Sequence, residues 1–84
     1  SMIAGETRDR FEEKKDGLRE AHQIQQQAIY PENFDDPLDT EEALNELEEL
    51  AEQYDDGSDG FVHDYLTSVK QEINELHNGS EYGF

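Results

Sequence analysis

Apolar residues recur at spacings of three and four residues in three separate stretches of this chain. The last stretch shows the pattern most clearly, with Val62, Tyr65, Leu66, Val69, Ile73 and Leu76. This spacing gathers side chains on one face of an α-helix, whereas a half-buried strand would alternate apolar and polar residues. The chain is therefore predicted to be all-α.

The first stretch runs from about Glu6 to Tyr30, where Pro31 and the turn-rich residues after it end the helix. Its expected apolar face holds Phe11, Leu18, His22, Gln25 and Ile29, with Ala21 and Ala28 alongside. Two of these positions hold polar residues, so this face is less suited to packing in an internal core. Dimerisation through the first helix therefore stays open. His22 is interpreted as a hydrogen-bonded interface residue rather than a metal ligand.

The second stretch reaches Tyr54 and carries its apolar residues on one face: Leu44, Leu47, Leu50, Ala51 and Tyr54. Asp39 is its predicted N-cap, because Glu42 follows three residues later in a capping-box arrangement and Leu38 can pack against Ala43. For the third helix, Ser58 or Asp59 is the candidate N-cap, and the Asn78-Gly79 pair is the expected left-handed ending.

Three amphipathic helices with short connections predict a small three-helix bundle, in which a long N-terminal helix packs on an antiparallel helical hairpin. At 84 residues the chain has room for one domain with a thin core. We expect residues 6–79 to form that domain. Residues 1–5 are expected to be a flexible start in which Ser1 is a cloning remnant, and residues 80–84 a loosely held tail.

The negative charge of the chain is unevenly distributed. Residues 1–19 carry five acids and five bases, whereas residues 20–84 carry eighteen acids against Lys70 alone, so the formal net charge of −17 belongs to the second segment. The segment Pro31–Gly60 holds thirteen acids and no Lys, Arg or His. Nucleic acids and anionic membranes are poor partners for such a chain, because they are bound through Lys and Arg. A basic protein partner is the natural expectation.

The segment DDGSDGFV has a motif-like appearance. It resembles the start of an EF-hand calcium loop, and the resemblance would make Asp55, Asp59 and Phe61 the ligands at positions 1, 5 and 7. The pattern fails at position 3, which is Gly57, and at position 12, where Leu66 replaces the bidentate Glu. We therefore expect a capped acidic turn, with a degenerate EF-hand-like calcium site as the weaker alternative.

No catalytic motif is visible, and no cofactor is expected. The three histidines form no metal-binding pair along a helix, and the chain has no Gly-rich phosphate loop. The carboxylates lie on polar faces, where nothing would raise their pKa for acid–base catalysis. The chain lacks Cys and any long apolar run, which fits a cytoplasmic, non-enzymatic protein that does not enter a membrane.

These observations lead to the hypothesis of a nucleic-acid-mimicking inhibitor or regulator of a DNA- or RNA-binding protein. The expected partner-binding acids have no base nearby in the sequence, and those near the end of the second helix oppose its dipole. They are Glu41, Glu42, Glu46, Glu48, Glu49, Glu52, Asp55, Asp56 and Asp59. Phe34, an aromatic residue in the acidic linker, either plugs the bundle, which we favour, or anchors the partner.

Two alternatives remain open. The first is an interaction or assembly module that uses apolar helix faces. The second is an acidic protein adapted to high salt.

Overall fold

The computed structural model describes the backbone of residues 4–81 and the side chains of residues 10–79. Three α-helices and one short 3₁₀ helix follow each other along this part of the chain. They are α1 (Ala4–Ile29), η1 (Pro31–Asn33), α2 (Thr40–Tyr54) and α3 (Phe61–Glu81). Each α-helix packs against the other two, and the described residues contain no strand, so the predicted all-α three-helix bundle is confirmed.

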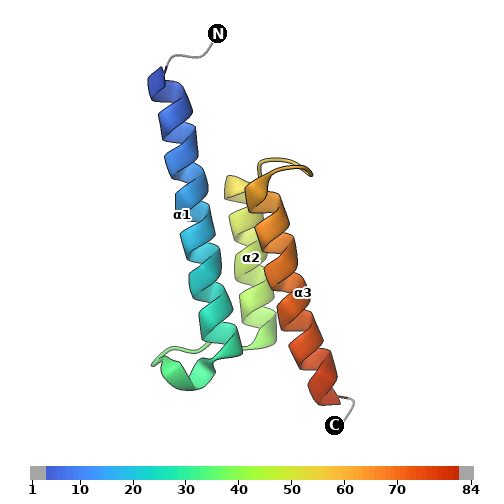
Figure 1. The fold of residues 1–84 in the computed structure, drawn as a ribbon. Helices are drawn as coiled ribbons and strands as arrows, with labels where there is room; N and C mark the ends of the chain where they lie inside the picture. The colour runs from blue at the N-terminus through green and yellow to red at the C-terminus, as the bar shows by residue number, and fades with distance from the viewer. Residues whose placement is uncertain (1–3, 82–84) are drawn as a thin grey trace.

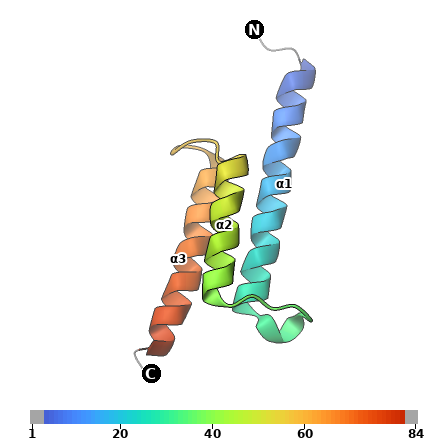
Figure 2. The ribbon, with the colours of Figure 1, turned by 180° about the vertical axis from the view of Figure 1, so that it is seen from behind.

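In Figure 1 the helices run down, up and down, so that α2 is antiparallel to both of its neighbours. The view from behind shows that the N-terminal part of α1 extends beyond the end of the α2–α3 hairpin (Figure 2). At the other end, the last turns of α3 project past α2 (Figure 1). These projections make the molecule elongated, with principal extents of 55 × 28 × 16 Å.

The core is a thin layer of aliphatic side chains contributed by all three helices. The buried residues are Ala21, Ile24, Ala43, Leu47, Leu50, Val62, Leu66, Val69 and Ile73. In α2 and α3 they follow the predicted faces. In α1 the prediction was wrong in part: buried Ile24 was not on the expected face, and Phe11, which was, is 60% exposed. Lys15 Nζ lies over the Phe11 ring, 5.4 Å from its centroid.

The polar residues on the expected face of α1 contact α3. The Tyr65 hydroxyl donates to Gln25 Oε1 at 2.9 Å, and Gln25 Nε2 donates to Glu72 Oε1 at 2.5 Å. His22 Nδ1 lies 3.3 Å from the same hydroxyl, so His22 is the hydrogen-bonded interface residue that the sequence predicted. The polar side chains on this face of α1 therefore make hydrogen bonds within the chain.

The helix ends agree with the sequence at α2 and differ from it at α3. Asp39 caps α2, because its side chain accepts a hydrogen bond from Glu42 N at 2.8 Å, as predicted. For α3, the expected caps Ser58 and Asp59 are wrong. Asp56 reaches over the turn instead, and its carboxylate accepts from His63 N at 3.1 Å and Val62 N at 3.4 Å.

The predicted ending of α3 at Gly79 is also wrong, because the helix continues to Glu81. Gly57 has the only positive φ among the described residues, so Gly79 does not adopt the left-handed conformation. Ser80 and Glu81, which were assigned to a loose tail, are helical; the rest of that tail and most of the expected flexible start lie outside the described residues.

Gly17 allows α1 to approach the end of α2. It is buried, and a Cβ atom at this position would lie 2.8 Å from Cγ and 3.0 Å from Cβ of Tyr54. These atoms are at the root of the Tyr54 side chain, so they cannot move aside without displacing the whole ring. The glycine costs helix propensity and in return lets the two helices pack closely.

We predict that Gly17→Ala destabilises the protein by about 1 kcal/mol, because overpacking of about 1–3 kcal/mol exceeds a helix-propensity gain of about 1 kcal/mol. Chemical denaturation followed by circular dichroism measures the change. Gly79→Ala is the matched control, since a Cβ there meets nothing within 4 Å, and it should leave stability equal or raised. A Gly17→Ala protein that is more stable than the wild type would contradict the close packing.

Candidate protein-binding surface

The acids of α2 lie in two rows on its exposed faces. Glu42, Glu46 and Glu49 follow one another at four and three residues, on the side that faces α1. Glu41, Glu48 and Glu52 form the second row, on the side that faces α3. All six side chains are exposed. The structure thus places the predicted α2 acids on both sides of the outward surface rather than along one line.

Three of the predicted partner-binding acids have partners within the chain. Lys70 Nζ lies 3.3 Å from Glu48, Lys14 Nζ lies 3.2 Å from Asp56, and His63 Nδ1 lies 2.9 Å from Asp55. The expectation that these three acids have no base nearby was therefore wrong, because helix packing brings bases from α1 and α3 to them. Within residues 10–79, the other six predicted acids make no ion pair: Glu41, Glu42, Glu46, Glu49, Glu52 and Asp59.

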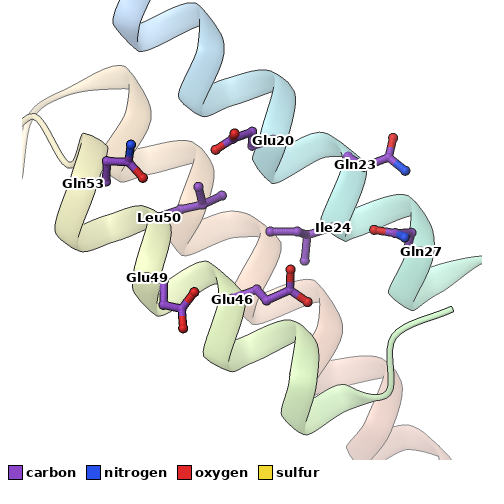
Figure 3. A pocket seen from close by; sticks show the side chains of 8 residues that line it. All are labelled: Glu20, Gln23, Ile24, Gln27, Glu46, Glu49, Leu50 and Gln53. Carbon is purple, nitrogen blue, oxygen red and sulfur yellow. The ribbon is translucent and has the colours of Figure 1, made fainter. Parts of the chain in front are cut away.

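A groove of about 350 Å³ lies between α1 and α2 (Figure 3). Ile24 and Leu50 form its floor, and the remaining lining residues are Glu20, Gln23, Gln27, Glu46, Glu49 and Gln53. Glu20 and Glu46 extend from opposite helices toward each other's helix, with the two apolar side chains between them, whereas Gln23 and Glu49 point outward (Figure 3). Carboxylates thus flank a small apolar surface.

The α1 side of this seam is acidic as well. Glu13, Asp16 and Glu20 are spaced by three and four residues and lie on one face of α1. The pKa of the Tyr54 hydroxyl at the end of the seam is raised, first by burial and then by the negative charge of Glu20, Asp16 and Glu13. Both helices therefore contribute negative potential to the groove.

Sequence reasoning identified Glu46 and Glu49 but missed Glu20, Ile24 and Gln27. A signal for them exists, because the acids and amides of α1 recur along one helical face while Lys15 and Arg19 lie elsewhere. The face that the sequence predicted to be apolar contains His22 and Gln25, and this face contacts α3.

The turn between α2 and α3 is a capped acidic turn, the preferred interpretation of DDGSDG. Asp55 Oδ1 accepts from Gly57 N at 2.7 Å, and Asp56 caps α3. Gly60 makes this cap possible, because a Cβ there would overlap the Asp56 carboxylate. Of the calcium-ligand candidates, Phe61 is 80% exposed and Asp59 is exposed. No group of three or more His, Cys, Asp or Glu side chains in the described part is placed to hold a metal ion.

Phe34 lies in the connection between η1 and α2 and is half-buried. It is not among the side chains that pack against the core, so it does not plug the bundle as favoured from the sequence. No helix in the described part of the chain is long and apolar enough to cross a bilayer.

Comparisons of the chain with protein-family models, with curated proteins and with solved structures found no match.

Asp56 is predicted to stabilise the turn in two separable ways. Asp56→Ala should lower the free energy of unfolding by about 1–2 kcal/mol, because the helix cap is lost. Asp56→Asn keeps a side-chain oxygen that can cap α3 but loses the charge beside Lys14, so we expect a smaller loss. Thermal denaturation of the two variants measures both effects, and an alanine variant as stable as the wild type would show that the cap is unimportant.

The Asp55–His63 pair is predicted to make stability depend on pH near neutrality. Hydrogen bonding to Asp55 raises the pKa of His63, and the same bond, helped by Gly57 N–H, lowers the pKa of Asp55. The stabilisation is thus full between the ordinary carboxyl pKa of 3.8 and the ordinary histidine pKa of 6.5. It is lost as pH rises through the raised pKa of His63 or falls through the lowered pKa of Asp55. NMR titration should show the His63 pKa falling toward 6.5 in Asp55→Asn. An unchanged pKa in this variant would contradict the pairing.

Proposed function

We propose that this protein binds the basic surface of a nucleic-acid-binding protein and thereby occupies the place of nucleic acid as an inhibitor or regulator. One observation carries the proposal: the outward surface of α2 and the adjoining α1–α2 groove form a continuous acidic area. Within the described side chains, Lys70 beside Glu48 is the one base ion-paired to an α2 acid. Such an area repels nucleic acid and attracts the sites that bind it.

The charge spacing of α2 supports this proposal. Six acids lie in two rows between Glu41 and Glu52. At about 1.5 Å rise per residue they span about 16.5 Å, or about 3.3 Å of helix axis per charge when both rows are counted. One strand of B-form DNA carries a charge every ~3.4 Å along the axis. The acids Glu13, Asp16 and Glu20 on α1 add negative charge beside these rows. A basic groove built for phosphates would therefore meet a similar charge density on this protein.

The second candidate, an assembly module with apolar helix faces, has weaker support. Four large apolar side chains are strongly exposed among those described: Phe11, Tyr30, Phe61 and Leu76. They are distributed over different elements, because Phe11 belongs to α1, Tyr30 precedes η1, and Phe61 and Leu76 belong to the two ends of α3. Scattered apolar residues of this kind are normal on protein surfaces.

We predict that capture of the partner depends on the unpaired α2 acids and on ionic strength. The tagged protein is used in pull-downs at about 50 mM and about 300 mM salt, with quantitative mass spectrometry and with duplex DNA as competitor. The partner should be a basic nucleic-acid-binding protein that DNA displaces and that high salt releases. Neutralising Glu41, Glu46, Glu49 and Glu52 to Gln should abolish its capture.

The matched control changes the charge by the same amount elsewhere. It combines Glu12→Gln, Asp35→Asn, Asp64→Asn and Glu75→Gln, all at exposed positions outside α2 and outside the acidic face of α1, and should retain the partner. Circular dichroism establishes that both proteins stay helical. A captured partner that stays bound at high salt, is not displaced by DNA and binds the α2 variant normally would refute the proposal and favour the assembly module.

A further inference from the structure

The groove between α1 and α2 combines an apolar floor with a rim that accepts hydrogen bonds. Ile24 and Leu50 are 6% and 7% exposed, so they present a small apolar surface at the bottom of the groove. Glu20 extends over this surface from α1, and Glu46 extends over it from α2 (Figure 3). A ligand that enters must therefore bring an apolar portion to the floor and positive charge to the rim.

Gln27 adds a third acceptor whose orientation is fixed by the chain. Its side-chain Nε2 donates to the backbone carbonyl of Asp36 at 3.1 Å. Since the nitrogen is held by the connection between η1 and α2, the amide oxygen is turned toward the groove, as Figure 3 shows. Two carboxylates and this oriented carbonyl make the inner rim a set of acceptors.

No positively charged side chain in the described part of the chain matches these acceptors. Among the described residues, no Lys, Arg or His lines the groove, and none forms an ion pair with Glu20 or Glu46. The raised pKa of nearby Tyr54, caused by burial and then by Glu20 and its neighbours, agrees with an uncompensated negative potential here. A positively charged ligand would relieve this repulsion.

The volume of the groove limits what fits. About 350 Å³ is close to the lower end of ligand-binding pockets, so the groove admits one long side chain rather than a helix, whose diameter is about 10–12 Å. Arginine matches this shape and chemistry. Its aliphatic stem packs on apolar surface, and its planar guanidinium carries five N–H donors and no acceptor. Lysine offers a more strongly hydrated point charge, which bridges separated carboxylates less well.

We infer that this groove binds a single arginine side chain projecting from the basic partner. The stem would lie over Ile24 and Leu50, and the guanidinium would bridge Glu20 and Glu46 beside the Gln27 carbonyl. The inference rests on the proposed function and makes it more specific: the outer acids supply long-range attraction, and the groove supplies an anchor that distinguishes arginine from lysine. Buried arginines of this kind are frequent energetic centres of protein interfaces.

The test uses capped alanine-based peptides of equal length that carry arginine, lysine or the neutral isostere citrulline at the same positions. Calorimetry and NMR titration should show arginine peptide binding about threefold or more tighter than lysine peptide, and no binding of citrulline peptide. Intermolecular NOEs should connect the arginine methylenes with the Ile24 and Leu50 methyl groups.

Two double variants with equal charge change separate the groove from the general acidic surface. Glu20→Gln with Glu46→Gln should weaken the arginine peptide about tenfold and remove its advantage over lysine. Glu41→Gln with Glu52→Gln, on the side of α2 that faces α3, should weaken both peptides equally and by less. All four residues are exposed, so circular dichroism should show unchanged folding.

Equal effects of the two double variants, or absence of the NOEs, would overturn the groove inference. The proposal that the α2 surface binds a basic protein would survive that result, because the salt dependence and DNA competition of the captured partner test it. Conversely, arginine selectivity at the groove with no partner that DNA displaces would refute the nucleic-acid mimic and retain the arginine site.

Discussion

The structure depends on a thin apolar core that must outweigh the mutual repulsion of many carboxylates. Nine buried side chains, none larger than leucine or isoleucine, hold three helices together in a chain of net charge −17. Burial is worth about 25 cal/mol per Å² of apolar surface, so a core of this size leaves little margin. Close approach of the helices is therefore needed, and the small residues Gly17, Ala21 and Ala43 provide it.

The balance between this thin core and carboxylate repulsion is reflected in where the charges lie. Bases reach acids at the ends and on the α3 side of the bundle, where Lys14 meets Asp56 and Lys70 meets Glu48. On the opposite side, α1 and α2 both turn acids toward the groove between them, and no base lines that groove among the described side chains. Repulsion is tolerated along this groove although it opposes folding. That arrangement fits a surface whose compensating charge comes from another molecule.

Much of the fold could be predicted from the sequence, because regular spacing of aliphatic residues in α2 and α3 fixes which faces are buried. The N-cap of α2 was predictable too, since Asp39 acts on its own helix. The cap of α3 was not, because Asp56 lies five residues before the helix and reaches it only through the turn that Gly60 permits.

The face of α1 was harder to predict for a different reason. Phe11 belongs to the same helical face as Leu18 but is 60% exposed, and local spacing does not encode how far the neighbouring helices cover that face. The groove could not be predicted from the sequence either, because it depends on which sides of α1 and α2 face each other. Glu46 was predicted as a surface acid, whereas its pairing with Glu20 across an apolar floor required the packed structure.

The projecting part of α1 has a further physical consequence. The first 19 residues, which include the N-terminal part of α1, carry no net charge, whereas the rest of the chain carries −17, so neutral and negative regions are separated. In a molecule 55 Å long, this separation produces a large electric dipole moment. Near a positively charged surface the dipole experiences a torque that turns the projecting end outward and brings the hairpin inward. The orientation of the molecule is therefore selected before any side chain makes contact.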